Sequence, residues 1–187
     1  ITDGATPKVA TAVYPGLVNK HSVARPQAEG ENAFGVCGAD SRLVKAVRRP
    51  VTEEGVVFGF VGDPVMVGNE ILTRLVSDGF VPVISPITHD GQGQLLNTNA
   101  DTVASEIARA MSPDFEVTLT YCFEKEGVLD GDGKIIDSIN PIRYSSLKEE
   151  GIVSGGMLPK LDNAFSALNA GVHNVRITSA TAPEGGT

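Results

Sequence analysis

Helix-like and strand-like segments alternate from residue 69 to residue 178, and this alternation limits the fold more than any single motif does. The helix-like segments carry apolar residues at helical spacing, whereas the strand-like ones are short apolar runs such as FVPVISPI, typical of strands buried on both faces. We expect helices at 69–77, about 101–111, 140–151 and 157–171, and strands at 80–87, 115–123 and 172–178. This order predicts an α/β layered fold with a mostly parallel sheet.

The first thirty residues also show helical spacing, with apolar residues at Val9, Val13 and Leu17. Prolines at positions 7, 15 and 26 oppose a continuous helix, because each lacks a backbone N–H and its ring clashes with the preceding turn. A broken or kinked helix is therefore expected up to about Gly30. Strands are expected next, within 32–40, 43–51 and 54–67.

Composition excludes several classes of protein. With 187 residues, 41% hydrophobic and 20% charged, the chain has the profile of an ordinary globular protein. Its formal net charge of −8 argues against a nucleic-acid partner, because affinity for phosphate backbones comes mainly from Lys and Arg. The longest apolar runs are too short to span a bilayer, so no membrane partner is expected either.

Cys37 and Cys122 lie far apart in apolar surroundings, and we expect both to be reduced, buried small hydrophobes of a cytoplasmic chain. Nothing near Ile1 resembles a signal peptide, and Ile1 is not an initiator methionine. The chain is therefore expected to begin inside a longer protein.

Common catalytic signatures are missing from the sequence. The three histidines have no metal-ligand spacing and there is no G-x-S-x-G, which disfavours zinc enzymes and serine hydrolases. The DGDGK segment at 130–134 suggests a calcium loop or a P-loop, but Lys134 and Ile135 stand where those motifs need other residues. A hairpin turn explains the segment better.

Asn97, Asn99 and Asp101 form the first candidate site, where a strand leads into a helix. Ligands of open α/β sheets bind at the carboxyl ends of strands, so these side chains are candidates for substrate binding and catalysis. The alternative is structural: one asparagine caps the helix and Asp101 complements its dipole. That alternative explains one or two of the three residues.

The segment SGGMLPKLDNAF at 154–165 is the second candidate site. Two glycines before a helix allow backbone N–H groups to approach an anion, and Lys160 adds a full positive charge near the helix N-terminus. The alternative is a solvated lysine after a flexible loop. An acid and a lysine on loops from different strands suit phosphoryl transfer, in which the protein positions groups and neutralises charge.

The motifs around these sites are similar to those of a known family. GQLLNTNAD, EEGIVSGGMLPKLDNAFSALNAGV, VPVISPI and VYPGLVNK resemble the acetylglutamate kinases, within the amino-acid kinase superfamily, over nearly the whole chain. The resemblance implies a three-layer α/β sandwich of the carbamate kinase type with its N-terminal part missing. RRPV and LTYCFEKEGVL look like a subgroup that uses N-succinyl- instead of N-acetyl-glutamate.

The resemblance also implies roles for residues and regions. Residues 1–111 would be the remainder of an N-terminal lobe that binds the acylglutamate and dimerises, and 112–187 a C-terminal ATP-binding lobe without its last strand. The product would be an acylglutamyl phosphate in arginine biosynthesis, made by a homodimer, with Mg²⁺ bridging the phosphates of ATP. Asp101 and Lys160 would be catalytic, Asn97 and Asn99 would bind substrate, and Thr120, Gly127, Gly156, Met157 and Lys160 would surround the nucleotide.

Two alternatives to this function stay open. One is another amino-acid kinase, acting on carbamate, aspartate or a nucleotide. The other is a catalytically incomplete fragment that binds nucleotide or dimerises, because the resemblance places a further lysine and glycine-rich loops upstream of Ile1.

Overall fold

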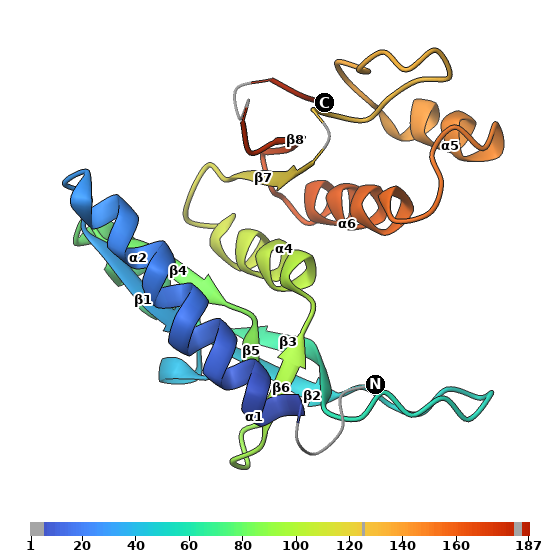
Figure 1. The fold of residues 1–187 in the computed structure, drawn as a ribbon. Coiled ribbons are helices and arrows are strands. Elements are labelled where there is room, and N and C mark those ends of the chain that lie inside the picture. Colours follow the sequence, from blue (N-terminus) through green and yellow to red (C-terminus); the bar gives the residue numbers. More distant parts are fainter. Residues whose placement is uncertain (1–5, 125, 182–184) are drawn as a thin grey trace. The chain divides into compact units, whose positions relative to one another are not determined.

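The structure is a computed structural model that describes residues 6–124, 126–181 and 185–187. Helices and strands are interspersed along the chain, with some consecutive strands, such as those between residues 81 and 98, and consecutive helices, such as those between residues 141 and 169 (Figure 1). The chain divides into two compact units, Ile1–Ala110 and Met111–Thr187. The α/β class expected from the sequence is confirmed. The roles that the resemblance gives to the two parts of the chain stay predictions.

The first unit begins with three helical segments in succession, α1 (Thr6–Thr11), the π-helix η1 (Ala12–Val18) and α2 (Asn19–Ala28). Pro15 lies inside the π-helical segment. A π-helix is wider than an α-helix, and this widening lets the backbone continue past a residue that donates no hydrogen bond. The predicted break is therefore not found at Pro15: Thr11, Val18 and Asn19 keep right-handed helical φ and ψ values, and the helical backbone continues past the proline as a π-helix.

Strands β1 (Ala33–Cys37) and β4 (Val81–Ser85) form a parallel pair beside α2 (Figure 1). The buried side chain of Asn19 fixes α2 on this pair, because its Nδ2 donates to the Val83 carbonyl at 2.7 Å and to the Val36 carbonyl at 3.3 Å. Gly35 leaves the room for that side chain, since a Cβ at this position would clash with Asn19 Oδ1.

Four further strands of the first unit close into a small barrel in the order β2-β3-β6-β5. They are β2 (Val44–Arg48), β3 (Val61–Val67), β5 (Ile87–His89) and β6 (Leu95–Thr98). The fully buried Thr88 and the buried Thr98 share a hydrogen bond of 2.8 Å between their hydroxyls. Buried polar groups need such partners, so the pair satisfies itself inside the barrel.

Two further helices of the first unit, α3 (Asn69–Ser77) and α4 (Ala100–Met111), lie where the sequence predicts them. A short 3-10 turn, η2 (Asp40–Arg42), comes earlier in the chain. Gly79 ends α3 with a φ of 79°, while the Phe80 N–H bonds back to the Leu75 carbonyl. This is the glycine-terminated helix end that the Asp78-Gly79 pair predicts.

Two strand predictions are wrong in part. The predicted strand 54–67 is a strand only from Val61, because Gly55 and Gly59 adopt φ values of 81° and 77° that an extended strand does not allow. The run 80–87 is two strands instead of one. Pro86 lies between β4 and β5, and it has no N–H to continue the ladder.

The second unit contains β7 (Thr118–Phe123), α5 (Pro141–Glu149), α6 (Met157–Asn169) and β8 (Asn174–Ser179). The two strands pair in parallel, with Thr118 opposite Asn174 and Phe123 opposite Ser179. A parallel pair needs a long crossover, and the two helices lie within that connection. Asn140 caps α5, because its side-chain oxygen accepts the Arg143 N–H at 2.8 Å, and Pro141 occupies the first turn.

The hairpin predicted at 130–134 is confirmed. Leu129 and Ile135 face each other in an antiparallel bridge, and the Asp130 carboxylate accepts the backbone N–H groups of Asp132 at 2.9 Å and Lys134 at 2.8 Å. The aspartate thus shapes the turn. Local side-chain bonding of this kind is the reason that Asp-Gly segments favour turns.

The expectation of two buried cysteines is right for Cys37 and wrong for Cys122, which is exposed. Side chains alternate between the two faces of β7, so the buried Tyr121 and the exposed Cys122 lie on opposite faces. The apolar residues beside Cys122 in the sequence therefore did not predict its burial, because Cys122 lies on the exposed face of β7.

Candidate active site

A cavity of about 810 Å³ in the second unit contains Lys160. Its lining comes from the end of β7, the N-terminus of α6 and the end of β8: Phe123, Glu124, Ser154, Gly156, Met157, Lys160, Ser179, Ala180 and Thr181. The carboxyl ends of two parallel strands and a helix N-terminus therefore meet at one place. This is the edge at which α/β sheets bind their ligands.

The loop before α6 makes the helix N-terminus accessible in this cavity. Gly155 adopts a φ of 56°, a left-handed conformation that favours glycine, and Gly156 precedes the helix without a side-chain cap. The N–H groups of Met157 and Leu158 make only turn hydrogen bonds of 3.3 Å with the carbonyls of Ser154 and Gly155. Together with the helix dipole, this backbone end favours an anion.

Lys160 lies in the first turns of α6, with its ammonium over two aromatic rings of β7. Its Nζ is 5.7 Å from the ring centroid of Tyr121 and 5.9 Å from that of Phe123. An ammonium this close to aromatic faces is stabilised by cation–π attraction, which limits the positions it can take. The alternative of a freely solvated lysine after a flexible loop therefore does not describe Lys160.

The structure brings together three of the five residues predicted for the nucleotide, namely Gly156, Met157 and Lys160. Thr120 does not line the cavity. It is exposed on the face of β7 opposite the buried Tyr121, and its register partner on β8 is Arg176. The sequence shows that Thr120 lies three residues before Phe123, but it does not show which face of β7 carries the Thr120 side chain.

Gly127 does not line the cavity either, and its surroundings explain the glycine by packing. A Cβ at this position would lie 2.9 Å from Ile135 Cγ2 and 2.9 Å from Thr187 Oγ1. The same Thr187 hydroxyl oxygen accepts the Val128 N–H at 3.0 Å. Gly127 thus allows the hairpin and the last described residues to approach each other closely.

Ser179, Ala180 and Thr181 line the cavity but were not among the predicted site residues. The hydroxyls of Ser179 and Thr181 lie 3.0 Å apart. These residues follow the last predicted strand directly, so the rule that ligands bind at the carboxyl ends of strands was the signal that could have identified them.

Asn97, Asn99 and Asp101 lie in the first unit, at the junction of β6 and α4. The half-buried Asn97 is in β6, where its N–H donates to the Phe60 carbonyl at 2.8 Å. The Asn99 side-chain oxygen accepts the Thr102 N–H at 3.0 Å, so Asn99 is the cap of α4. Asp101 is in the first turn of that helix. The capping alternative therefore holds for Asn99.

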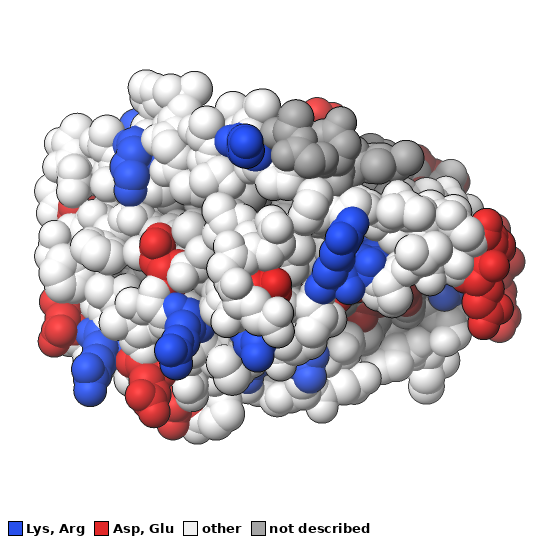
Figure 2. Space-filling model, turned by 90° about the horizontal axis from the view of Figure 1, so that it is seen from below, with Lys and Arg blue, Asp and Glu red and all other residues white. Residues whose placement is uncertain are grey.

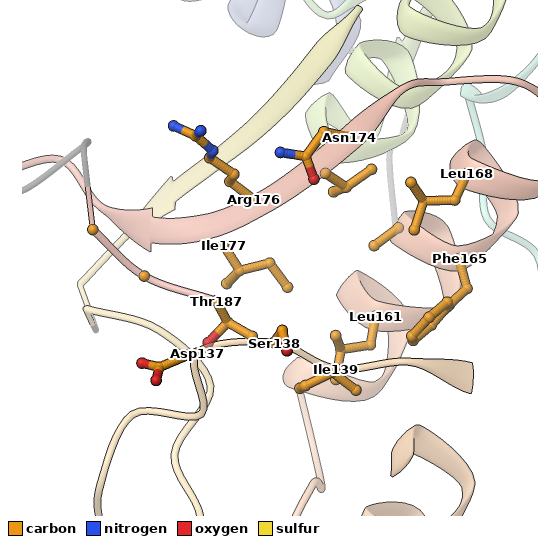
Figure 3. A pocket seen from close by; sticks show the side chains of 14 residues that line it. Asp137, Ser138, Ile139, Leu161, Phe165, Leu168, Asn174, Arg176, Ile177 and Thr187 are labelled. Carbon is orange, nitrogen blue, oxygen red and sulfur yellow. The ribbon is translucent and has the colours of Figure 1, made fainter. Parts of the chain in front are cut away.

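A second cavity in the same unit as Lys160, of about 360 Å³, lies between α6 and β8. Leu161, Phe165 and Leu168 point into it from α6, and Ile177 from β8 (Figure 3). Asn174, Arg176 and Asp137 also lie along it. None of the predicted site residues lines this cavity, which makes the cavity around Lys160 the candidate active site.

The remaining described features bear on metals, membranes and surface charge. Within residues 6–124, 126–181 and 185–187, no three His, Cys, Asp or Glu side chains come together as a metal site. No helix in these ranges has both the length and the apolar character needed to cross a bilayer. On the face in Figure 2, Lys and Arg side chains lie among Asp and Glu side chains.

Comparison with known proteins gives consistent results. Residues 1–179 match the model of the amino acid kinase family. An acetylglutamate kinase of Bacteroides fragilis is 52% identical over 192 residues, which cover 100% of this chain and 73% of that protein.

Two solved structures share the fold at low identity. The N-acetylglutamate synthase from Neisseria gonorrhoeae complexed with coenzyme A and N-acetyl-glutamate superposes with a TM-score of 0.85 at 19% identity, over 98% of this chain and 40% of that one. A carbamate kinase from Giardia reaches a TM-score of 0.64 at 12% identity, over 94% of this chain and 66% of that one. The fold is thus that of the amino-acid kinases, and the chain belongs to the acetylglutamate kinase family.

Proposed function

We propose that this protein is a kinase that transfers the terminal phosphoryl group of ATP to the side-chain carboxylate of an N-acyl-L-glutamate, as a step of arginine biosynthesis. The observation that carries the proposal is the 52% identity to a Bacteroides fragilis acetylglutamate kinase across the whole chain. A sequence identity of 52% over the whole chain favours an acetylglutamate kinase over a carbamate, aspartate or nucleotide kinase. N-acetyl-glutamate is the first substrate to test.

The cavity around Lys160 is the proposed site for the phosphates of ATP. Its volume of about 810 Å³ lies in the usual range of ligand pockets. Lys160 provides positive charge, and the uncapped N-terminus of α6 provides partly positive N–H groups. These groups would neutralise negative charge on the phosphoryl group during transfer, and such stabilisation is the main task of a phosphotransferase.

The roles of the remaining predicted residues stand as part of the same proposal. Asn97 would bind the acylglutamate, and Asp101 would orient the catalytic lysine side chains. Asn99 would act on substrate only in addition to capping α4. Mg²⁺ would be held largely by phosphate oxygens and water, as is usual for this ion at phosphate sites. The two free cysteines are compatible with the reducing cytoplasm, where we place the enzyme.

A direct assay tests the function. The purified protein is incubated with ATP, Mg²⁺ and either N-acetyl- or N-succinyl-glutamate, and the acyl phosphate is trapped with hydroxylamine. Carbamate and aspartate are tested separately as alternative phosphoryl acceptors. Formation of a hydroxamate with one acylglutamate, and with neither alternative acceptor, is the expected result. Turnover of carbamate or aspartate alone would assign the protein to another kinase class, and binding of ATP without any turnover would favour the incomplete fragment.

Lys160→Ala tests the assigned site. We expect kcat to fall by about two to three orders of magnitude, because removing one transition-state charge partner commonly costs that much. Folding should change little, since the ammonium side chain is only half-buried. Lys134→Ala, at the tip of the 130–134 hairpin, is the matched control and should keep wild-type kcat. An unchanged kcat in Lys160→Ala would remove Lys160 from the mechanism.

A further inference from the structure

Tyr144 links α5 to the helix that carries Lys160. The Tyr144 hydroxyl donates to Asp162 Oδ1 at 2.8 Å and lies 3.4 Å from the Leu158 carbonyl oxygen. Its ring stacks on Phe165 with centroids 5.1 Å apart and an interplanar angle of 22°. All three partners belong to α6, so a single side chain of α5 holds this helix through both its ring and its hydroxyl.

The α6 residues that contact Tyr144 lie before and after Lys160 in the sequence, but on a different face of the helix. Leu158, Asp162 and Phe165 follow one another at spacings of four and three residues, which places them on one face of α6. Lys160 is two residues from both Leu158 and Asp162, about half a turn away, so it points to the other side. There its ammonium meets Tyr121 and Phe123. The first turns of α6 are thus held between α5 and β7.

The bond between Tyr144 and Asp162 has the properties of a persistent contact. Tyr144 is buried. Its hydroxyl has one proton to donate, and the shorter of its two contacts, at 2.8 Å, is to the Asp162 carboxylate. Burial first, and then the hydrogen bond to Asp162 and its negative charge, raise the pKa of Tyr144 to about 12. The phenol therefore stays a donor at neutral pH. Hydrogen bonds to a charged acceptor are stronger than neutral ones.

We propose that Tyr144 and Asp162 are positioning residues that fix the rotation and height of the first turns of α6, and thereby the location of the Lys160 ammonium. This inference rests on the role proposed above for Lys160. Neither residue lines the cavity around Lys160, so both act through the helix and not on substrate. Phosphoryl transfer depends on charge placed to within a fraction of an ångström, so loosening this contact should affect the chemical step more than binding.

Tyr144→Phe is the first test, because it keeps the ring stacked on Phe165 and removes only the hydroxyl. We expect kcat of the full-length protein to fall about tenfold, because misplacing a catalytic group by 1 Å can lower the rate by about a hundredfold. KM for ATP and for the acylglutamate should change less than about twofold. Ser145→Ala is the matched control: this neighbouring hydroxyl donates to the Pro141 carbonyl of its own helix, and its loss should leave kcat unchanged.

Variants of Asp162 separate positioning from simple stability. Asp162→Asn keeps an oxygen that can accept from Tyr144 and should retain most of the wild-type kcat. Asp162→Ala should lower kcat as Tyr144→Phe does, and the double variant should be no worse than either single one, because both changes remove the same bond. The inference is overturned if Tyr144→Phe lowers the melting temperature while kcat per folded molecule stays at the wild-type value, or if the two changes multiply.

A readout without turnover distinguishes this inference from the proposed function. Lys160 can be acylated with acetic anhydride and quantified by mass spectrometry. We expect its labelling rate to rise about threefold or more in Tyr144→Phe and Asp162→Ala, and to stay unchanged in Ser145→Ala, because the ammonium would leave its place over the rings. If the wild type phosphorylates no acylglutamate but the labelling changes as expected, the proposed function fails and the positioning contact holds. Unchanged labelling in both variants would refute the proposal that this contact positions Lys160.

Discussion

Asn99 shows how one residue can fit two explanations until its neighbours are known. Its side chain accepts the Thr102 N–H at 3.0 Å and lies 3.3 Å from the Thr102 hydroxyl. Asn99→Ala should therefore lower the free energy of unfolding by about 1 kcal/mol, the usual effect of losing a helix cap. Asn99→Asp, which can still accept this hydrogen bond, should stay close to wild type. Urea denaturation measures both. If the alanine variant keeps wild-type stability and only KM for the acylglutamate rises, substrate binding is the function of Asn99.

Tyr144 makes a prediction about pH. Because its pKa is raised from 10.0 to about 12 in the folded protein, the neutral phenol is favoured by folding. The stability that it contributes is fully present below pH 10 and is lost as the pH rises towards about 12. The phenolate absorbance of the wild type minus that of Tyr144→Phe reports this titration, which should have a midpoint near 12. A midpoint near 10 would mean that the hydroxyl is solvated and not bound to Asp162.

At the scale of elements, the closed barrel of the first unit depends on a glycine. A Cβ on Gly62 would lie 2.8 Å from Thr98 Oγ1 and 2.9 Å from Leu96 Cβ, and both of these residues are buried. Gly62→Ala should thus reduce the free energy of unfolding by about 1–3 kcal/mol through overpacking. Gly131→Ala is the control, because its Cβ would meet nothing closer than Ile152 Cδ1 at 3.9 Å. Equal stability of the two variants would show that the barrel can expand.

The accuracy of the element predictions depended on whether the relevant interactions are local. The end of α3 at Gly79 and the 130–134 hairpin follow from contacts between residues close in sequence, and both were predicted. The helix that begins at Pro141 was predicted too, whereas its cap at Asn140 was seen only in the structure. The extent of β3 was not. Residues 54–60 have an apolar composition, but a strand also needs a partner, and Val61 is the first residue of this segment that lies in the barrel ladder.

At the scale of the whole molecule, we propose that the helical segment at the start of the first unit mediates homodimerisation. Val9 and Leu17 are 62% and 58% exposed, and Val13, Tyr14 and Val18 are exposed beside them on α1 and η1. Exposed apolar side chains gathered on one element are typical of protein interfaces. Leu17→Glu should convert a dimer to a monomer in light scattering after size-exclusion chromatography. Ser22→Glu, on α2, should leave the dimer intact. A monomeric wild type, or a dimeric Leu17→Glu variant, would contradict this proposal.

The sequence by itself determined the α/β class, most helix positions, the hairpin, the family and the position of Lys160 near a helix start. These depend on periodicity, on turn and cap residues, and on motifs, which are local properties of the chain. Only the tertiary structure decided which residues share a place: Ser179 and Thr181 join Lys160, whereas Thr120 and Gly127 do not. It also revealed the contact of Tyr144 with α6 and the exposure of Cys122. The physical reason is that the face of a strand and the partners of a helix are set by packing between segments distant in sequence, which no local pattern encodes.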